Sequence, residues 1–406
     1  MLINLFRYNV MKYSKIIIIF FISIISCGTA GNSSYSSKTK IKAVEIYPIS
    51  IPVAGNYPQN LYKFPYKART NEYLVYSQTV QWEPGVRKTF DTDTVYTAVV
   101  RLDPMNKNFT FKGSELGDIK GLPSEGVNSI TMETKEDSIV IRIVYEKTAG
   151  KKAESKLVFW DDFNGNSLDF SKWDYGPEWD RQGRSTWKDD MVSVNGGFLH
   201  LGFKRDPILG AAKSKNKTLA NNWIRCGAVR TRKKDGSMLF ACGFGFYEAR
   251  VKLPKVYGIW GAFWLMSPSQ WIMTDEGVIG TEIDIVETFD NPRHVYNAAL
   301  NWNGYGSNRK FANSFANKLP DIDIYDGEFH VFALDWSPLE YIFYVDGEIF
   351  WRVDGGAKFK NSGINQNPNY IKLTMESGEF SGAIPDDFTT GEMLVDYVRV
   401  YNQPRY

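Results

Sequence analysis

Three acidic residues lie close together near the middle of the chain: Glu282, Asp284 and Glu287. In a β-strand, successive side chains point to opposite faces, so Glu282 and Asp284 share a face while Glu287 would point to the other. A β-bulge at residues 285–286 would insert one extra residue and return Glu287 to the face of the other two. The spacing therefore predicts three carboxyl groups on one face of a bulged strand.

Two carboxyl groups held roughly 5–5.5 Å apart across a sugar ring are what a retaining glycosidase uses. In that chemistry Glu282 would attack the anomeric carbon as nucleophile, and Glu287 would protonate the leaving oxygen and then activate water. Asp284 would hydrogen-bond the nucleophile. Repulsion between neighbouring carboxylates would raise one pKa and keep that group protonated near neutral pH. From the spacing alone, a solvated acidic strand face is an equal alternative.

The composition favours an all-β protein with many turns. The chain has 406 residues, enough for two domains, and contains 12 Trp, 23 Tyr and 34 Gly. Its formal net charge of +2 gives no electrostatic reason to expect a nucleic-acid partner. The three histidines lack the spacing of a zinc site, and no Gly-x-Ser-x-Gly motif of a serine hydrolase occurs.

Residues 1–27 have the features of an export signal. Two lysines precede an apolar run, residues 16–25, which is too short to cross a bilayer as a helix. The run ends in Ile24-Ile25-Ser26-Cys27, which resembles the lipobox of bacterial lipoproteins. Cleavage there would leave Cys27 as a lipidated first residue, so we expect an exported lipoprotein anchored to a membrane of the bacterial cell envelope or cell surface. An ordinary cleaved signal is the alternative.

A tether and a small domain follow the signal. Residues 28–41 are rich in Gly and Ser and predict a flexible tether. Residues 42–150 alternate short β-like runs with turns, which predicts a small β-sandwich. The stretch 95–102 followed by 109–111 looks like repeats of bacterial surface proteins that carry immunoglobulin-like accessory modules. Because it holds no group of carboxylates, we expect this domain to be a spacer, with sugar binding as the alternative.

Residues 155–406 carry longer and more aromatic strand patterns, such as 246–251, 329–336 and 394–401. Asp346-Gly347 between two alternating runs is a strong hairpin signal, and no helical period competes with the strands. The basic runs 213–217 and 230–234 are expected in solvated loops. We therefore expect an antiparallel jelly-roll β-sandwich with one concave face free for a chain-like ligand.

Several stretches of this second domain together resemble glycoside hydrolase family 16, the laminarinase, lichenase, agarase and carrageenase group. Residues 282–287 match the bulged active-site motif of that family in full. The other matching stretches occur in the order found in the family and extend the resemblance over residues 157–403: 161–165, 227–231, 245–254, 258–266 and 395–401.

The resemblance implies a concanavalin A-like jelly roll and a monomeric, endo-acting, retaining hydrolase of β-linked polysaccharides. It assigns the nucleophile to Glu282, the acid/base to Glu287 and an assisting role to Asp284, with no cofactor required for the chemistry. A β-1,3- or β-1,3-1,4-glucan is the first expected substrate, and a galactan of the agar, porphyran or carrageenan type is the second. A transglycosylase with the same catalytic residues and a non-catalytic glycan-binding lipoprotein are the alternatives.

Sugar rings present apolar C–H faces that stack on aromatic side chains, although large aromatics also fill β-sandwich cores. The candidate stacking residues are Trp187, Trp264, Trp271 and Trp302. Asn301 stands where many laminarinases and agarases have a histidine near the reacting sugar, and it can hydrogen-bond a sugar hydroxyl but cannot titrate. The cations that a sulfated substrate would require could come from Arg181, Arg184 and Arg230.

Many members of the family bind a structural Ca²⁺ ion. The resemblance places its oxygen ligands at Asp162, the backbone of Gly196, and Asp396. An Asp396 that only completes a hydrogen-bond network is the alternative. A melting temperature unmoved by a chelator would speak against the ion.

Cys226 and Cys242 flank a predicted hairpin turn at 234–236. They would lie on neighbouring strands, so a disulfide is one expectation in an oxidising compartment. Two free cysteines are an equal alternative, because strand register decides whether the geometry fits.

Overall fold

The structure is a computed structural model that describes most of residues 38–403. The residues in this range left undescribed are 42–43, 46–48, 50, 59–75, 78–79, 87–88, 105–106, 153, 182–183, 272–276, 279, 290–294, 316–319, 339, 355–362, 379–380 and 383. The predicted signal with Cys27, and most of the predicted tether, lie outside the described residues. No described helix is long and apolar enough to cross a membrane.

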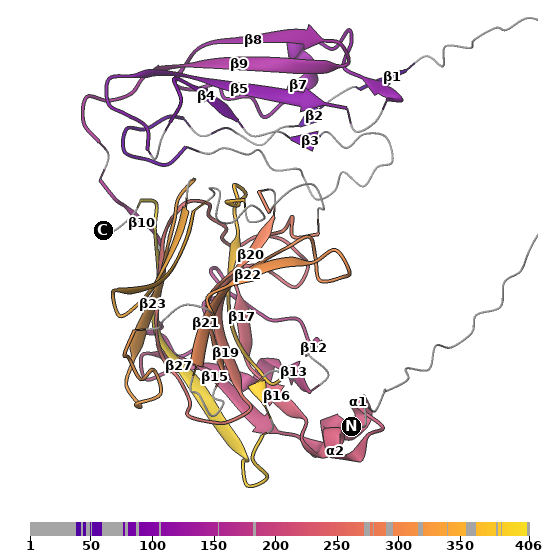
Figure 1. Cartoon of the computed structure of the whole chain (residues 1–406), viewed down its shortest axis with the longest axis vertical. Helices are drawn as coiled ribbons and strands as arrows, with labels where there is room; N and C mark the ends of the chain where they lie inside the picture. Colours follow the sequence, from indigo (N-terminus) through magenta and orange to yellow (C-terminus); the bar gives the residue numbers. More distant parts are fainter. Residues whose placement is uncertain are drawn as a thin grey trace, which may run out of the picture. The chain divides into compact units, whose positions relative to one another are not determined.

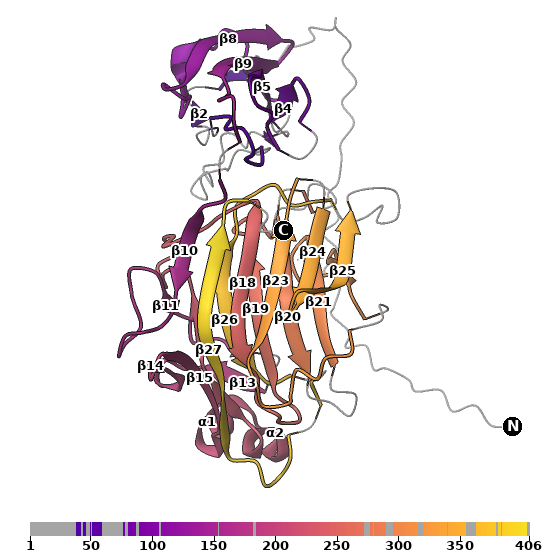
Figure 2. The ribbon, with the colours of Figure 1, turned by 90° about the vertical axis from the view of Figure 1, so that its left-hand side faces the viewer.

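Residues 157–403 form two stacked β-sheets, which confirms the predicted jelly-roll sandwich (Figures 1 and 2). The larger sheet follows the order β12-β13-β16-β15-β27-β18-β23-β24-β25, with β10 beside β27 and β14 beside β15. Its strands are β10 (Leu157–Asp161), β12 (Asp180–Arg181), β13 (Ser185–Trp187), β14 (Val192–Asn195), β15 (Phe198–Arg205), β16 (Ile224–Cys226), β18 (Gly245–Lys252), β23 (His330–Trp336), β24 (Glu340–Val345), β25 (Glu348–Asp354) and β27 (Thr390–Tyr401).

The smaller sheet carries the predicted carboxylate strand at its centre. Its order is β11-β17-β26-β19-β20-β21-β22. The strands are β11 (Asp174–Tyr175), β17 (Ala228–Arg230), β19 (Trp260–Met266), β20 (Thr281–Phe289), β21 (Val295–Trp302), β22 (Lys310–Asn313) and β26 (Tyr370–Glu376).

Alternating side chains from both sheets fill one core between them. Leu199 and Leu201 of β15 and Ile283 and Ile285 of β20 belong to the same buried cluster, and none is exposed. Burial of each such side chain contributes about 1.5–3 kcal/mol. Because strand neighbours point to opposite faces, Glu282 and Asp284, on either side of Ile283 in β20, lie on the outer face of the smaller sheet.

The N-terminal part has its own sheet and core. Five strands pair in the order β3-β5-β9-β8 with β4 beside β5, and β1 pairs with β6 and β2 with β7. The strands are β1 (Thr39–Lys40), β2 (Val44–Glu45), β3 (Tyr76–Ser77), β4 (Gln81–Glu83), β5 (Val95–Asp103), β6 (Phe109–Thr110), β7 (Ile119–Lys120), β8 (Val127–Lys135) and β9 (Ser138–Lys147). A separate cluster that includes Tyr96, Ile141 and Tyr145 fills its interior. The immunoglobulin-like likeness and the domain boundaries stay predictions.

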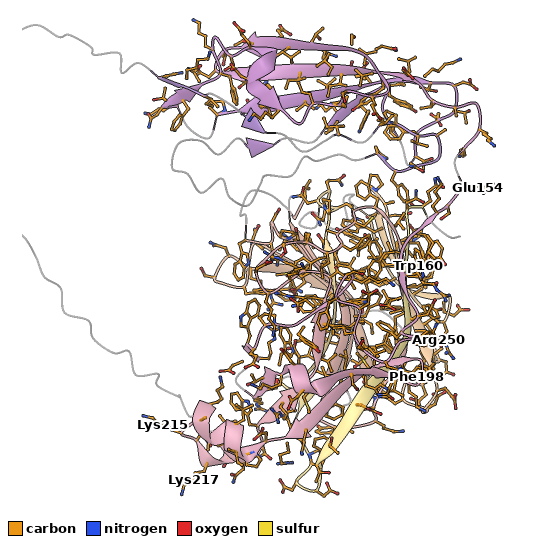
Figure 3. The ribbon with its side chains drawn as sticks, turned by 180° about the vertical axis from the view of Figure 1, so that it is seen from behind. Glu154, Trp160, Phe198, Lys215, Lys217 and Arg250 are labelled. Carbon is orange, nitrogen blue, oxygen red and sulfur yellow. The ribbon has the colours of Figure 1, made fainter. Side chains whose placement is uncertain are left out.

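Two short helices, α1 (Pro207–Lys213) and α2 (Lys217–Asn221), lie where the sequence predicted a solvated basic loop. Asp206 and Asn216 accept hydrogen bonds from the backbone amides of the first turns, which explains why such short helices begin there. Lys215 and Lys217 project into solvent from this region, so the predicted solvation holds although the helices were missed (Figure 3). Two 3₁₀ turns, η1 (Leu116–Asp118) and η2 (Asp189–Met191), complete the described elements.

Both predicted turns are present, and no disulfide joins the two cysteines. Asp346 and Gly347 have φ of 47° and 85°, as a tight hairpin turn between β24 and β25 requires.

The two cysteines lie apart in the fold. Cys226 pairs in register with Phe203 in the larger sheet, whereas Cys242 forms a bridge with Asn369 beside the smaller sheet. Both thiols are free.

Candidate active site

The pairing of β20 confirms the predicted bulge. On its β21 side, Asp284 pairs with Ala299 and Glu287 with Asn297, so three steps along β20 correspond to two along β21. The register against β19 shifts at the same place, between Asp284 and Val286. The extra residue therefore brings Glu287 to the face that already carries Glu282 and Asp284, as expected for a bulge that re-aims a side chain.

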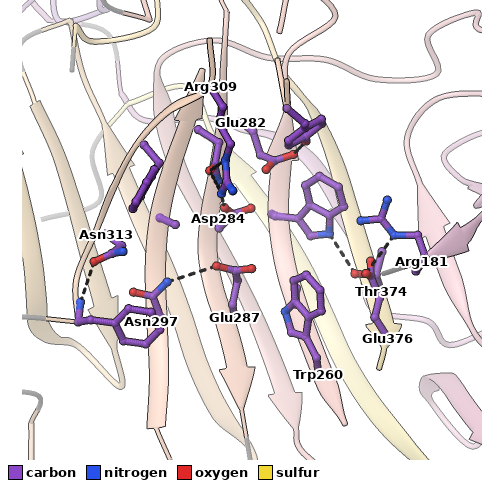
Figure 4. A pocket seen from close by; sticks show the side chains of 17 residues that line it. Arg181, Trp260, Glu282, Asp284, Glu287, Asn297, Arg309, Asn313, Thr374 and Glu376 are labelled. Carbon is purple, nitrogen blue, oxygen red and sulfur yellow. Dashed lines mark hydrogen bonds and ion pairs between the residues drawn. The ribbon is translucent and has the colours of Figure 1, made fainter. Parts of the chain in front are cut away.

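A cavity of about 590 Å³ lies over this outer face. It is lined by every second residue of neighbouring strands, together with the loop after β21 (Figure 4). The lining residues are Arg181, Trp260, Ala262, Trp264, Glu282, Asp284, Glu287, Asn297, Ala299, Asn301, Tyr305, Arg309, Phe311, Asn313, Phe315, Thr374 and Glu376. The three predicted carboxyl groups thus occupy the middle of a single cavity.

Asparagine amides from β21 support two of the three carboxyl groups. Asn297 Nδ2 donates to Glu287 Oε2 at 3.3 Å, and Asn301 Nδ2 donates to Asp284 Oδ2 at 2.9 Å. Asn301 Oδ1 accepts from Arg309 Nη2 at 2.6 Å. The predicted binding residue Asn301 therefore lies in the cavity, where its side chain contacts Asp284 and Arg309.

Two hydrogen bonds hold Glu282, one at its backbone amide and one at its carboxylate. Its backbone amide donates to Gln270 Oε1 at 2.9 Å. Its carboxylate Oε2 accepts a hydrogen bond from the hydroxyl of Tyr305. Glu282 is buried, with 6% of its surface exposed, and it lines the cavity.

The three carboxyl groups have raised pKa values for different reasons. Burial, and then repulsion by Glu282, raise the pKa of Glu287 to about 8. Burial and both glutamates raise the pKa of Asp284 well above its usual value. Burial also raises the pKa of Glu282, but the Tyr305 hydroxyl and three nearby cations oppose that rise: Lys372, Arg181 and Arg309. The surroundings therefore favour the charged form of Glu282 more than that of Glu287.

Cations and indole rings alternate beside the carboxylates. Lys372 Nζ lies 3.6 Å from the ring centre of Trp264 and 4.6 Å from that of Trp187. The Arg181 guanidinium lies 4.5 Å from the Trp187 ring, and its Nε contacts Glu376 Oε2 at 3.0 Å. Burial, and then repulsion by Arg181, lower the pKa of Lys372 well below its usual value. This stack places the Arg181 and Lys372 side chains against indole rings beside the carboxyl groups.

The four predicted stacking tryptophans differ in whether they are buried in the core or accessible at the cavity and the surface. Trp264 lines the cavity, and Trp271 is 58% exposed with its ring 5.2 Å from that of Tyr305. The prediction is wrong for Trp187 and Trp302, which are 0% and 2% exposed and belong to the core. Neither buried ring presents a face to a sugar.

The predicted cations also differ in placement. Arg181 lines the cavity. Arg230 is buried and donates from Nη2 to the backbone oxygen of Lys233, so its run is not a wholly solvated loop. Arg184 donates to the backbone oxygen of Gly382 and is not among the lining residues.

Sequence reasoning missed four aromatic residues of the cavity: Trp260, Tyr305, Phe311 and Phe315. The spacing of Trp260 and Trp264, four apart on one strand, already placed both on one face. Phe311 and Phe315, 60% and 58% exposed, come from the edge of the sheet, where no motif marked them. Tyr305 comes from a loop, whose path the sequence pattern does not determine.

Two of the three predicted calcium ligands, Asp162 and Asp396, are paired with arginines. Asp162 Oδ1 accepts from Arg399 at 2.8 Å, and Asp396 Oδ2 accepts from Arg250 at 2.6 Å. Arg250 lies on β18 of the larger sheet (Figure 3). These arginines already compensate both carboxylates, and no group of three acidic, histidine or cysteine side chains that could hold a metal occurs among the described residues. Calcium binding stays a prediction from the resemblance.

Residues 157–403, more than half of the chain, match the family model described as "Beta-porphyranase A-D, GH16 domain". The chain belongs to glycoside hydrolase family 16. The match spans both sheets of the sandwich and includes all three carboxyl groups of β20.

Curated relatives and a solved structure agree with this membership. Glucan endo-1,3-beta-glucosidase A1 of Niallia circulans is 24% identical over 62% of this chain and 38% of its own length. Keratan-sulfate endo-1,4-beta-galactosidase of Sphingobacterium multivorum is 28% identical over 62% of this chain and 56% of its own length. The chain thus spans less than two thirds of both relatives. The laminarinase catalytic domain of Thermotoga maritima MSB8 is 20% identical with a TM-score of 0.50, covering 63% of this chain and 100% of that domain, and shows the shared fold.

Proposed function

We propose that this member of glycoside hydrolase family 16 is an endo-acting, retaining hydrolase that cuts internal β-linkages of a polysaccharide. The observation that carries the proposal is a pair of glutamates on one strand face, in one cavity, with different neighbours. Glu282 lies among cations that favour its carboxylate, while Glu287 has its pKa raised to about 8. A double displacement requires this pair of states.

In the first step, a Glu282 oxygen attacks the anomeric carbon while Glu287 gives its proton to the glycosidic oxygen. The bond to the leaving sugar breaks, and a glycosyl ester of Glu282 remains. In the second step, the Glu287 carboxylate takes a proton from water as the water oxygen attacks the same carbon and Glu282 leaves as a carboxylate. Asp284, two residues from Glu282 on the same face, supports the nucleophile.

The dimensions of the cavity support cleavage within a chain. Its lining comes from five adjacent strands, β26, β19, β20, β21 and β22. With neighbouring strands roughly 4.8 Å apart, the lining extends about 20 Å across the sheet. The carboxyl groups lie on its middle strand, so sugars have room on both sides of the reacting bond.

A β-1,3- or mixed-linkage glucan is the first candidate substrate, supported by the similarity to a glucan endo-1,3-beta-glucosidase. A sulfated galactan is the second candidate, and two observations favour it. The matching family model is named for porphyranases, and Arg181 and Arg309, which line the cavity, place positive charge beside the nucleophile. We further propose export and lipid anchoring at Cys27, which the lipobox-like Ile24-Ile25-Ser26-Cys27 supports.

The release of reducing ends from laminarin, lichenan, agarose, porphyran and carrageenan tests the activity. We expect release from at least one glycan, and a loss of at least about 10³-fold in Glu282→Gln, because the nucleophile cannot be replaced by an amide. Glu348→Gln, an exposed glutamate on β25, is the matched control and should keep full activity.

The products distinguish the alternatives. Chains longer than the substrate, seen by mass spectrometry, would identify a transglycosylase. Tight binding to a glycan without release from any, in wild type and in Glu282→Gln alike, would identify a glycan-binding protein and refute the hydrolase.

A further inference from the structure

A tyrosine from the loop after β21 reaches the nucleophile. The Tyr305 hydroxyl donates to Glu282 Oε2, and within the described part of the chain this is the side-chain hydrogen bond that the Glu282 carboxylate receives. The same hydroxyl lies 3.9 Å from Met266 Sδ. Tyr305 lines the cavity, so its hydroxyl acts where the reaction would occur.

The backbone beside Tyr305 is linked to the strand of Glu282 through Gln270. The Gly304 amide donates to the backbone oxygen of Gln270 at 2.9 Å, and the Gln270 side chain accepts from the amide of Glu282 at 2.9 Å. Gln270 is fully buried. A single residue therefore ties the loop of Tyr305 to the strand of the nucleophile, which fixes the distance between the two groups.

Trp271 completes this arrangement and limits what Gly304 can be. Its ring lies 5.2 Å from the Tyr305 ring at an interplanar angle of 79°, the edge-to-face geometry that aromatic pairs prefer. Gly304 has φ of 69°, and a Cβ there would lie 2.7 Å from the Trp271 ring. A glycine thus allows the indole to approach the loop and to hold the phenol from one side.

We propose that Tyr305 is a positioning residue that holds Glu282 Oε2, so that Oε1 is the oxygen presented to the anomeric carbon. The role rests on the proposed hydrolase function. Tyr305 transfers no proton: its hydroxyl donates to the carboxylate before attack, to the ester carbonyl oxygen in the glycosyl-enzyme, and to the carboxylate again as water releases the sugar. The donor favours the ionised form of Glu282 before attack, and it stabilises the charge that develops on the carboxylate as the ester breaks in the second step.

The hydrogen bond also affects the pKa of Glu282. It lowers the pKa of Glu282 against the rise that burial causes. The other charged or titratable groups that act on Glu282 come from several elements: Asp284 and Glu287 on β20, Tyr370 and Lys372 on β26, Arg181 on β12 and Arg309 after β21. Removal of the phenol oxygen alone leaves all of these in place, so any change in titration is due to the lost donor.

Tyr305→Phe is the decisive variant because it keeps the ring against Trp271 and removes the hydroxyl. We expect kcat/KM to fall about 10- to 100-fold, the factor that loss of one hydrogen bond to a charged group produces. The acidic limb of the pH profile of kcat/KM should move upward by roughly 1–2 pH units, since Glu282 then stays protonated to higher pH. Tyr175→Phe on the edge strand β11 is the matched control and should change neither quantity.

A titration by ¹³C NMR gives a readout that needs no turnover. The carboxyl resonance of Glu282, identified by its loss in Glu282→Gln, should titrate at higher pH in Tyr305→Phe than in wild type. An unchanged titration, or an acidic limb that stays in place while kcat/KM falls, would overturn the positioning role. A shifted titration in a protein that cleaves no glycan would support the contact and refute the hydrolase, so the two failures are distinguishable.

Discussion

Glu287→Gln should make the protein more stable at alkaline pH while it removes activity. The pKa of Glu287 is raised from 4.5 to about 8 in the folded protein, so folding favours the protonated form. The stability contributed by that preference is fully present below pH 4.5 and is lost as the pH rises through about 8. A difference of roughly 3.5 pH units corresponds to at most about 5 kcal/mol at pH 9. Part of it is mutual repulsion with Glu282, so we expect the neutral amide to recover about 2 kcal/mol.

Thermal melts of wild type and Glu287→Gln between pH 4 and pH 9 measure this difference. Two kcal/mol corresponds to about 4–8 °C for a domain of this size, so the variant should melt that much higher at pH 9. The two curves should meet near pH 4.5, where both side chains are neutral in the folded protein. Equal melting temperatures at pH 9, or a difference that does not change with pH, would refute the assignment of a buried, repelled carboxyl group to this position. Glu348→Gln, which is exposed, should follow wild type at every pH.

Two other predictions concern packing and anchoring. Gly227→Ala should lower the stability by about 1–3 kcal/mol, because a Cβ there would lie 2.3 Å from the backbone oxygen of Met191; Gly243→Ala, with no atom within 4 Å, should melt like wild type. Cys27→Ser, expressed in a bacterium, should move from the membrane fraction to the soluble fraction and lose incorporation of labelled fatty acid, whereas Cys242→Ser should stay with the membrane; an unchanged distribution of Cys27→Ser would exclude the lipid anchor.

The bulged strand was predictable from the sequence. Side chains of a strand alternate between its two faces, and the spacing of the three acidic residues breaks that alternation once. Ile283 and Ile285 had to face the core, so Glu282 and Asp284 had to face outward, and only an inserted residue could bring Glu287 to the same side. The hairpin at Asp346-Gly347 was predictable for an equally local reason, the positive φ of both residues. Features that depend on two or three neighbouring residues were thus available without a structure.

Features that depend on long-range packing were not. Trp187 and Trp302 carry the same chemistry as Trp264, and only the sheet arrangement decides that the first two are core residues and the third lines the cavity. The short helices α1 and α2 begin at side-chain caps, Asp206 and Asn216, in a stretch with too few residues to show a helical period. Tyr305 was missed because its place depends on Gln270 and Trp271, which a motif search along β20 does not connect to it.

The proposed division of roles between the two glutamates likewise depends on residues of other strands and loops. The motif on β20 is nearly symmetric, with one glutamate at each end of a short acidic run. The asymmetry comes from the neighbours: Lys372 and Arg181 favour charge on Glu282, whereas repulsion by Glu282 and Glu376 disfavours charge on Glu287. An exchange of the two roles would require these cations to move to the other end of the cavity. The proposed assignment of nucleophile and acid therefore depends on β26, β12 and the loop after β21. For this reason the spacing of three carboxyl groups alone left a solvated acidic face as an equal alternative.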